Sequence, residues 1–225
     1  MSAHYAMRTG LRDWRRGGAL LGLAALILLG GCSAIRPLLA PATHPDYYAL
    51  AYTPDASANA AAAIRSSGRN LPTLIISPPQ AAAGFDSQRM MYTRRADQLE
   101  YFANNEWIDT PARMLAPLLV AALGNSGGFR TVVQTPSPAS GELRLDIEIL
   151  RLQQEFFSTP SRVRFALRAT LVESATRRVI ATREFEAVIS TASDDPHGGV
   201  VAANRAVKIV LDELAAYCAD APRRP

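Results

Sequence analysis

Residues 143–149 read LRLDIEI, a strict alternation of apolar and charged side chains. Successive side chains of a strand point to opposite faces of a sheet, so this pattern predicts a strand with one buried and one solvated face. Two further stretches, 163–171 and 179–189, alternate in the same way. The residues expected on the buried face are Leu143, Leu145, Ile147 and Ile149, then Val163, Phe165, Leu167, Ala169 and Leu171, then Val179, Ala181, Phe185, Ala187 and Ile189. Together the three stretches predict an antiparallel meander with one apolar face.

The other face of this meander is expected to carry charges of both signs. Opposite charges on neighbouring strands stabilise a solvated sheet face. The residues concerned are Arg144, Asp146 and Glu148 on the first strand, Arg164 and Arg168 on the second, and Glu184 and Glu186 on the third.

Two helices are predicted to pack on the sheet. Residues 111–123 form the first, because Thr110 can cap it, Pro111 suits the first helical position and Gly124 suits its end. Residues 200–218 form the second, which is preceded by Asp195 as N-cap and is expected to lie across the apolar face of the meander. Shorter strands are expected at residues 47–52, 74–76, 89–92, 98–103 and 129–134. The expected fold is a single domain of mixed α/β composition, in the α+β class, with a twisted, mixed, largely antiparallel sheet and two main helices packed on it.

The N-terminal segment has the layout of a lipoprotein signal peptide. Four arginines precede an uncharged apolar stretch, residues 17–31, which is shorter than the roughly 20 residues that cross a bilayer. The stretch ends in Leu29-Gly30-Gly31-Cys32, where small residues admit the processing peptidase. We expect cleavage before Cys32, diacylglycerol on its thiol and an acyl chain such as palmitate on its amine. An ordinary signal peptide followed by an unrelated cysteine is the alternative.

The remaining chain divides into three parts. Residues 32–46 contain three prolines and are expected to form a lipidated N-terminus and flexible tether, residues 47–220 the domain, and residues 221–225 a disordered tail. Removal of residues 1–31 takes four Arg and one Asp from 24 basic and 20 acidic residues, which leaves 20 and 19. This balance gives no electrostatic footprint for nucleic acid. Cys218 is expected to be a small apolar core residue.

Catalytic and metal-binding motifs are not expected in this chain. Residues 124–128 match G-x-S-x-G at Ser126, but a nucleophile elbow follows a strand and opens a helix, whereas this stretch ends a helix. His44 and His197 are far apart in sequence, so no metal or cofactor site is predicted. The sequence therefore favours a protein that is not an enzyme, and a hydrolase that uses Ser126 is an alternative.

Aromatic residues cluster before the first helix. Two interpretations remain open for Tyr92, Tyr101 and Trp107. They can line a groove for a partner or ligand, since aromatic rings are rigid and amphipathic. Alternatively, the aromatic side chains pack the helix onto the sheet.

Several stretches in order resemble the ABC-type transport auxiliary lipoprotein component family, the PqiC-like lipoproteins. They are residues 47–50 (YYAL), 91–94 (MYTR), 99–103 (LEYFA), 106–107 (EW) with Pro111 and Leu115, 128–129 (GF) with Val132 and Val133, and 195–196 (DP) with Ala203 and Leu211. The resemblance covers nearly all of the chain after Cys32. It implies a mixed domain in which helices pack on a twisted sheet, as expected above.

The resemblance also implies a function. Members are non-enzymatic periplasmic lipoproteins that dock on an MCE-domain protein of an ABC-type system, which moves lipids or other hydrophobic molecules between membranes. It implies anchoring at the periplasmic face of the outer membrane, and Ser33 is not the aspartate that retains lipoproteins in the inner membrane of enteric bacteria. A ring of identical subunits is a further implication, since a family member forms one. A structural lipoprotein in outer-membrane or cell-wall assembly is the alternative function.

Overall fold

The computed structural model describes residues 44–54 and 70–221 of the 225-residue chain. The expected signal peptide, Cys32, the tether before His44 and residues 222–225 lie outside the described residues. Everything below concerns the unit that begins at Pro45.

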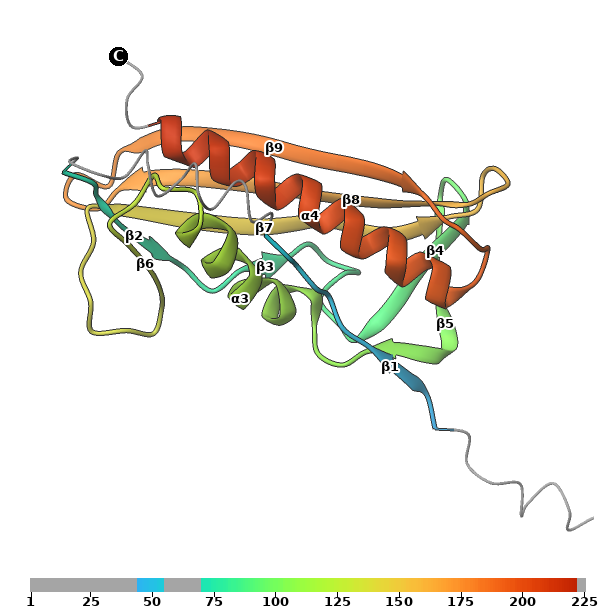
Figure 1. Cartoon of the computed structure of the whole chain (residues 1–225). Coiled ribbons are helices and arrows are strands. Elements are labelled where there is room, and N and C mark those ends of the chain that lie inside the picture. The colour runs from blue at the N-terminus through green and yellow to red at the C-terminus, as the bar shows by residue number, and fades with distance from the viewer. Residues whose placement is uncertain (1–43, 55–69, 222–225) are drawn as a thin grey trace, which may run out of the picture. The chain divides into compact units, whose positions relative to one another are not determined.

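Three long antiparallel strands form the largest part of the sheet. They are β7 (Leu143–Glu155), β8 (Arg162–Glu173) and β9 (Val179–Ser190), and β8 lies between the other two. This confirms the predicted meander (Figure 1). The placement of Val179 on the buried face is wrong, since 55% of its surface is exposed. A register shift opposite Leu171 and Val172 inserts one extra residue into β9, which reverses the alternation at its start.

Short strands cover the other edge of β7 one after another. β2 (Thr73–Ile76), β3 (Gln80–Ala81) and β4 (Arg89–Arg95) each pair in parallel with a different part of β7. The sheet continues beyond them through β6 (Thr131–Gln134), which is parallel to β2, and β5 (Gln98–Trp107), which is antiparallel to β4. β1 (Asp46–Tyr48) pairs in parallel with β5. The nine-stranded sheet is therefore mixed, and its long ladders are antiparallel.

The first strand is shorter than the expected residues 47–52. After Tyr48 the chain leaves the sheet and crosses to the C-terminal helix, where the backbone N–H of Ala51 donates to Asn204 Oδ1 at 2.9 Å. The hydroxyl of Tyr52 donates to Asp212 Oδ1 at 2.8 Å. These bonds to the helix replace the ladder that continued pairing would have made.

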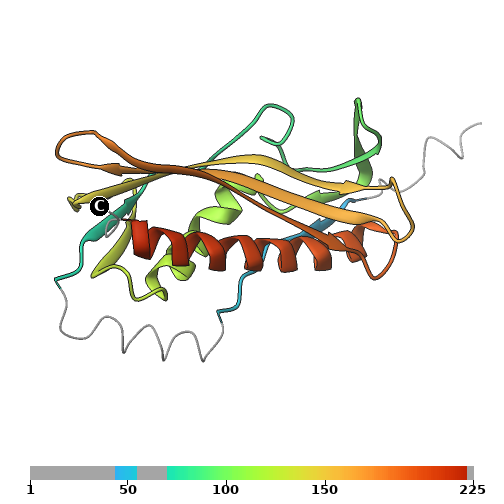
Figure 2. The same ribbon diagram turned by 90° about the horizontal axis from the view of Figure 1, so that it is seen from above.

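Two helices pack on one face of the sheet. α4 (Pro196–Asp220) runs along β8 and β9 (Figure 2), and α3 (Pro111–Gly124) contacts α4 and β6. The apolar stripe expected on α4 is buried at every position: Val200, Ala203, Val207, Val210, Leu211, Leu214 and Cys218. The predicted fold class is thus confirmed, and no helix in the described ranges is long and apolar enough to span a membrane.

The two helix N-termini differ in their capping. The side chain of Asp195 accepts a hydrogen bond from the Gly198 N–H at 2.7 Å, as predicted. Thr110 occupies the N-cap position of α3, but its hydroxyl makes no capping hydrogen bond, so the prediction of side-chain capping by Thr110 is wrong. The carboxylate of Asp109 instead accepts from the Thr110 N–H at 2.8 Å.

Removal of the Asp195 cap should destabilise the domain modestly. We expect Asp195→Ala to lower the free energy of unfolding by about 1 kcal/mol, because the Gly198 N–H loses its partner. Thermal unfolding followed by circular dichroism would measure this. Thr110→Ala is the matched control and should change stability by less than about 0.5 kcal/mol. Equal losses in the two variants would show that the Asp195 bond contributes nothing specific.

Cys218 lies in the core, as predicted. Only 1% of its surface is exposed, and burial raises the pKa of its thiol to about 12. A thiol with such a pKa stays protonated at neutral pH and behaves as an apolar group.

Candidate functional site

Trp107 and Tyr92 both lie in packed surroundings. Trp107 ends β5 with 4% of its surface exposed and belongs to the main apolar core. The ring of Tyr92 lies 4.6 Å from that of Phe102 and 5.7 Å from that of Phe156, and its hydroxyl donates to Glu100 Oε2 at 2.9 Å. These contacts fix the β4–β5 hairpin to the end of β7.

Tyr101 lies on the other face of the hairpin from Tyr92. Tyr92 pairs with Glu100 and Met91 pairs with Tyr101, so the two tyrosines point to opposite sides of the sheet. Tyr101 is 49% exposed, and the guanidinium of Arg89 lies 4.2 Å from the centre of its ring. The structure therefore does not bring Tyr92, Tyr101 and Trp107 together into one lining.

Ser126 takes part in the end of α3. Its hydroxyl donates to the Leu123 carbonyl at 2.7 Å, and it lies between a helix and the strand β6, the reverse of a nucleophile elbow. Among the residues that the structure describes, no group of three or more His, Cys, Asp or Glu side chains is arranged to hold a metal ion.

The face of the sheet opposite the helices is organised by two arginines of the central strand β8. Arg168 donates to Glu148 of β7 at 2.8 Å and to Glu184 of β9 at 2.7 Å. Arg164, four residues earlier on the same strand, bonds in the same way to Glu155 of β7 and Glu186 of β9. We call this surface the open face. Its two Glu–Arg–Glu rows contain the predicted charges Glu148, Arg164, Arg168, Glu184 and Glu186, together with Glu155, which was not predicted.

Glu155 is the most buried charge on the open face. Its side chain is 5% exposed, and its carboxylate accepts from Arg164 Nε at 2.7 Å, from Arg164 Nη2 at 3.2 Å and from Gln153 Nε2 at 3.1 Å. Burial alone would raise the pKa of this carboxyl, but the hydrogen bonds from Arg164 and Gln153 outweigh burial and lower the pKa. The group is thus held ionised in a nearly closed environment.

Sequence analysis did not place Glu155 on this face. Alternation from Leu143 would predict that odd-numbered residues of β7 are buried throughout, but a bulge between Ile149 and Arg151 reverses the pattern. Beyond it Arg151, Gln153 and Glu155 point to the open face. The adjacent apolar pair Ile149-Leu150 is the signal in the sequence that could have revealed the bulge.

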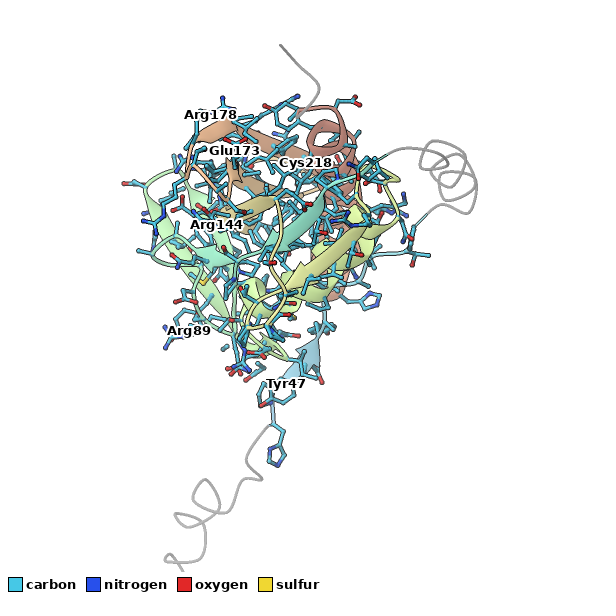
Figure 3. The ribbon with its side chains drawn as sticks, turned by 90° about the vertical axis from the view of Figure 1, so that its left-hand side faces the viewer. Tyr47, Arg89, Arg144, Glu173, Arg178 and Cys218 are labelled. Atoms are coloured by element: carbon cyan, nitrogen blue, oxygen red, sulfur yellow. The ribbon has the colours of Figure 1, made fainter. Side chains whose placement is uncertain are left out.

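Two hollows lie on the open face. The first, which we call the hairpin cleft, has a volume of about 400 Å³ between the tip of the β4–β5 hairpin and β7–β8, and its lining includes Asp97, Leu99, Arg151, Glu155, Phe157 and Arg164. The second has a volume of about 380 Å³ and is lined by polar residues such as Ser77, Asp146 and Arg168. Figure 3 labels Tyr47 and Arg89 at the β1 end of the domain, away from Arg178 and Glu173. Most of the residues that line each hollow are polar or charged, and the first hollow also has Leu99 and Phe157 in its lining.

Acidic pH should destabilise the domain through the carboxyl groups whose pKa is lowered in the folded protein, which include Glu142 as well as the three discussed next. Hydrogen bonds lower the pKa of Asp194, which accepts from the Ser161 N–H at 2.6 Å, and of Asp195, and the pKa of Glu155 is also lowered. As the pH falls below about 4, the unfolded chain binds protons before the folded protein does, so stability present at neutral pH is lost. We expect the Tm to fall between pH 5 and about pH 3 and to fall less steeply in Asp194→Asn. A Tm that is independent of pH across this range would contradict the assignment.

These observations define a class of protein: a single α+β domain whose helices cover one sheet face while the other presents ordered charges. A family model described as "ABC-type transport auxiliary lipoprotein component" matches residues 48–215. The chain belongs to this family, whose members are described as lipoprotein components auxiliary to ABC-type transport.

Solved structures show the same fold. A protein from Xanthomonas campestris of the DUF330 family superposes with a TM-score of 0.66 at 21% sequence identity, over 79% of this chain and 95% of that one. An uncharacterized protein superposes with a TM-score of 0.57 at 15% identity, over 78% and 97%. No curated protein matches the chain. At these identities the likeness shows the fold alone.

Proposed function

We propose that this chain is a non-enzymatic periplasmic lipoprotein subunit of an ABC-type system that moves lipids or other hydrophobic molecules between membranes. In this proposal its domain docks on an MCE-domain partner. Membership of the auxiliary lipoprotein family, over residues 48–215, is the observation that carries the proposal. The polar open face and the structural role of the Ser126 hydroxyl also support binding rather than catalysis.

Attachment by lipid on Cys32 would supply the mechanism. The 13 residues between Cys32 and β1 can extend over roughly 45 Å, enough for the domain to stand clear of the membrane surface. A tether raises the effective concentration of the domain near its partner without any new contact. We place the anchor at the periplasmic face of the outer membrane, and we include a ring of identical subunits in the proposal.

The predicted groove residues receive different roles. Tyr101 is exposed and remains available for contact with a partner. Trp107 and Tyr92 would act indirectly, since their packing holds the β4–β5 hairpin in place. The proposal therefore includes Tyr101 as a direct contact and the other two as positioning residues.

Purification of the full chain from membranes tests the proposal. We expect mass spectrometry to find Cys32 at the N-terminus with diacylglycerol and a third acyl chain, and the MCE-domain protein to co-purify. Cys32→Ser is the matched control and should release the domain from the membrane fraction. An unmodified Cys32 would overturn the lipoprotein anchor. Recovery of cell-wall or outer-membrane assembly proteins in place of the MCE-domain protein would favour the structural alternative.

A further inference from the structure

The two most exposed large apolar side chains of the described residues lie beside each other, where the domain begins. Ile108 is 60% exposed and Tyr47 is 57% exposed. The N–H of Ile108 donates to the Tyr48 carbonyl at 2.8 Å, which holds the end of β5 against β1. Ile108 directly follows the buried Trp107 and so points to the outer side of the strand. Single exposed apolar residues are common, but an adjacent pair on an ordered backbone indicates a contact surface.

An arginine lies on the same face of the sheet as this pair. β1 pairs Tyr47 with Glu106, and β4 pairs Arg89 with the same Glu106, so the three side chains form a row in which Tyr47 and Arg89 are about 10 Å apart. The guanidinium of Arg89 lies 4.2 Å from the centre of the Tyr101 ring. Figure 3 shows Tyr47 and Arg89 at the same end of the domain. We call Tyr47, Ile108 and Arg89 the β1 patch.

The β1 patch has no excess of positive charge around it. Arg89 and Glu106 are cross-strand neighbours of opposite sign. Two further acidic residues, Asp46 beside Tyr47 and Asp86 three residues before Arg89, are exposed. An occupant of the patch would therefore be held mainly by apolar contact, with Arg89 as a hydrogen-bond donor.

The direction of the chain before β1 indicates which occupant this is. Only 13 residues separate Cys32 from β1. A flexible chain of this length spans roughly 20 Å on average, less than half of its extended length. β9 begins at Val179, at the opposite end of the domain from β1, and α4 with its 25 residues extends about 37 Å between these ends (Figure 1). The tether permits the domain to leave the membrane or to rest on it, and an apolar surface beside the tether favours rest.

Tyrosine, isoleucine and arginine together suit the interfacial layer of a phospholipid membrane. Tyrosine is enriched there because its ring is apolar and its hydroxyl stays hydrated, and aliphatic side chains add buried apolar area. Arginine covers apolar surface with its stem and binds phosphate oxygens with its guanidinium.

We infer that the β1 patch rests on the membrane that carries the anchor, with Tyr47 and Ile108 in the interfacial layer and Arg89 on a lipid phosphate. The inference rests on the proposed lipid anchor and deepens the proposed function, since it states which end of the domain faces the membrane. Tyr101, at the border of the patch beneath Arg89, remains the contact proposed for the partner.

Photo-crosslinking of the full lipidated chain in phosphatidylcholine vesicles tests this contact. Benzoylphenylalanine would replace Tyr47 or Ile108 in the patch, and Val179 or Ile209 as control positions, which are 55% and 40% exposed. We expect crosslinks to phosphatidylcholine, identified by mass, at least fivefold more often from positions 47 and 108 than from the controls. With the crosslinker at position 108, Tyr47→Ser should reduce the yield at least threefold, Tyr47→Trp should retain it, and Val179→Ser should leave it unchanged.

The other outcomes distinguish failure of the contact from failure of the proposed function. Equal yields from all four positions, or a yield at position 108 that Tyr47→Ser does not lower, would overturn the membrane contact and leave the proposed function standing. A yield that rises with added phosphatidylglycerol would overturn it as well, because negative lipid charge would then hold the surface. Crosslinks only to a second copy of this chain, or only to an added MCE-domain protein, would assign the β1 patch to that protein. Mass spectrometry that finds Cys32 without lipid in the same preparation would overturn the proposed anchor, and the contact with it.

Discussion

Replacement of Arg164 by alanine should lower the free energy of unfolding by about 3 kcal/mol. Arg164 holds both oxygens of Glu155, whose side chain is 5% exposed, so its removal leaves a carboxylate nearly enclosed without its main partner. For a domain of this size the corresponding fall in Tm is about 10 °C. Thermal or urea unfolding at pH 7 would measure the change.

An exposed ion pair at the opposite end of β8 gives the control. Arg178 lies 3.7 Å from Glu173, and the two side chains are 68% and 37% exposed. An exposed pair of this kind contributes about 0–1 kcal/mol, so Arg178→Ala should be nearly neutral.

A second variant separates loss of the pair from loss of packing. Arg164→Ala combined with Glu155→Gln should be more stable than Arg164→Ala alone, because the double variant has no enclosed charge without a partner. If Arg164→Ala were as mild as Arg178→Ala, Glu155 would have to be hydrated in solution.

Most of the fold follows from short-range patterns in the sequence. The alternation from Leu143 to Ile149 fixes which face of β7 is buried, and the stripe from Val200 to Cys218 fixes which face of α4 covers it. These patterns are enough to predict the buried faces because burial of apolar side chains is the main force that drives folding. Buried side chains recur every second residue in a strand and about every 3.6 residues in a helix.

The candidate site could be predicted only in part, because bulges reset the pattern that sequence analysis extends. One extra residue near Ile149 turns Arg151 and Glu155 to the open face, and one in β9 exposes Val179. The pairing of β4 with β5 also changes register: Arg89 pairs with Glu106, but Met91, two residues later, pairs with Tyr101. An alternating pattern cannot predict which face a residue occupies beyond such a shift. For this reason the sequence did not show that Tyr92 and Tyr101 lie on opposite faces and that Trp107 lies in the core.

Close approach of two backbone segments is another feature that cannot be predicted from the sequence. Substitution of Gly128 tests whether such a contact is present. A Cβ at this position would lie 2.4 Å from the Cβ and 2.7 Å from the Cα of Ala219, near the end of α4. The helix backbone cannot yield as a flexible side chain would, so the connection from α3 to β6 would have to move. We expect Gly128→Ala to lower the free energy of unfolding by about 2 kcal/mol, the range of an overpacked core, which is a fall in Tm of about 6 °C.

Gly124, in the same glycine-rich turn, makes the comparison specific. No heavy atom lies within 4 Å of a Cβ built there, and the residue is helical at the end of α3. Gly124→Ala should therefore be neutral or stabilise the protein by up to about 1 kcal/mol through helix propensity. Two chemically identical substitutions four residues apart should thus change Tm in different ways, and circular dichroism melts of the two variants would show it. Equal effects would mean that the turn does not pack against α4 in solution, since the close contact with α4 at Gly128 is the reason to expect destabilisation there.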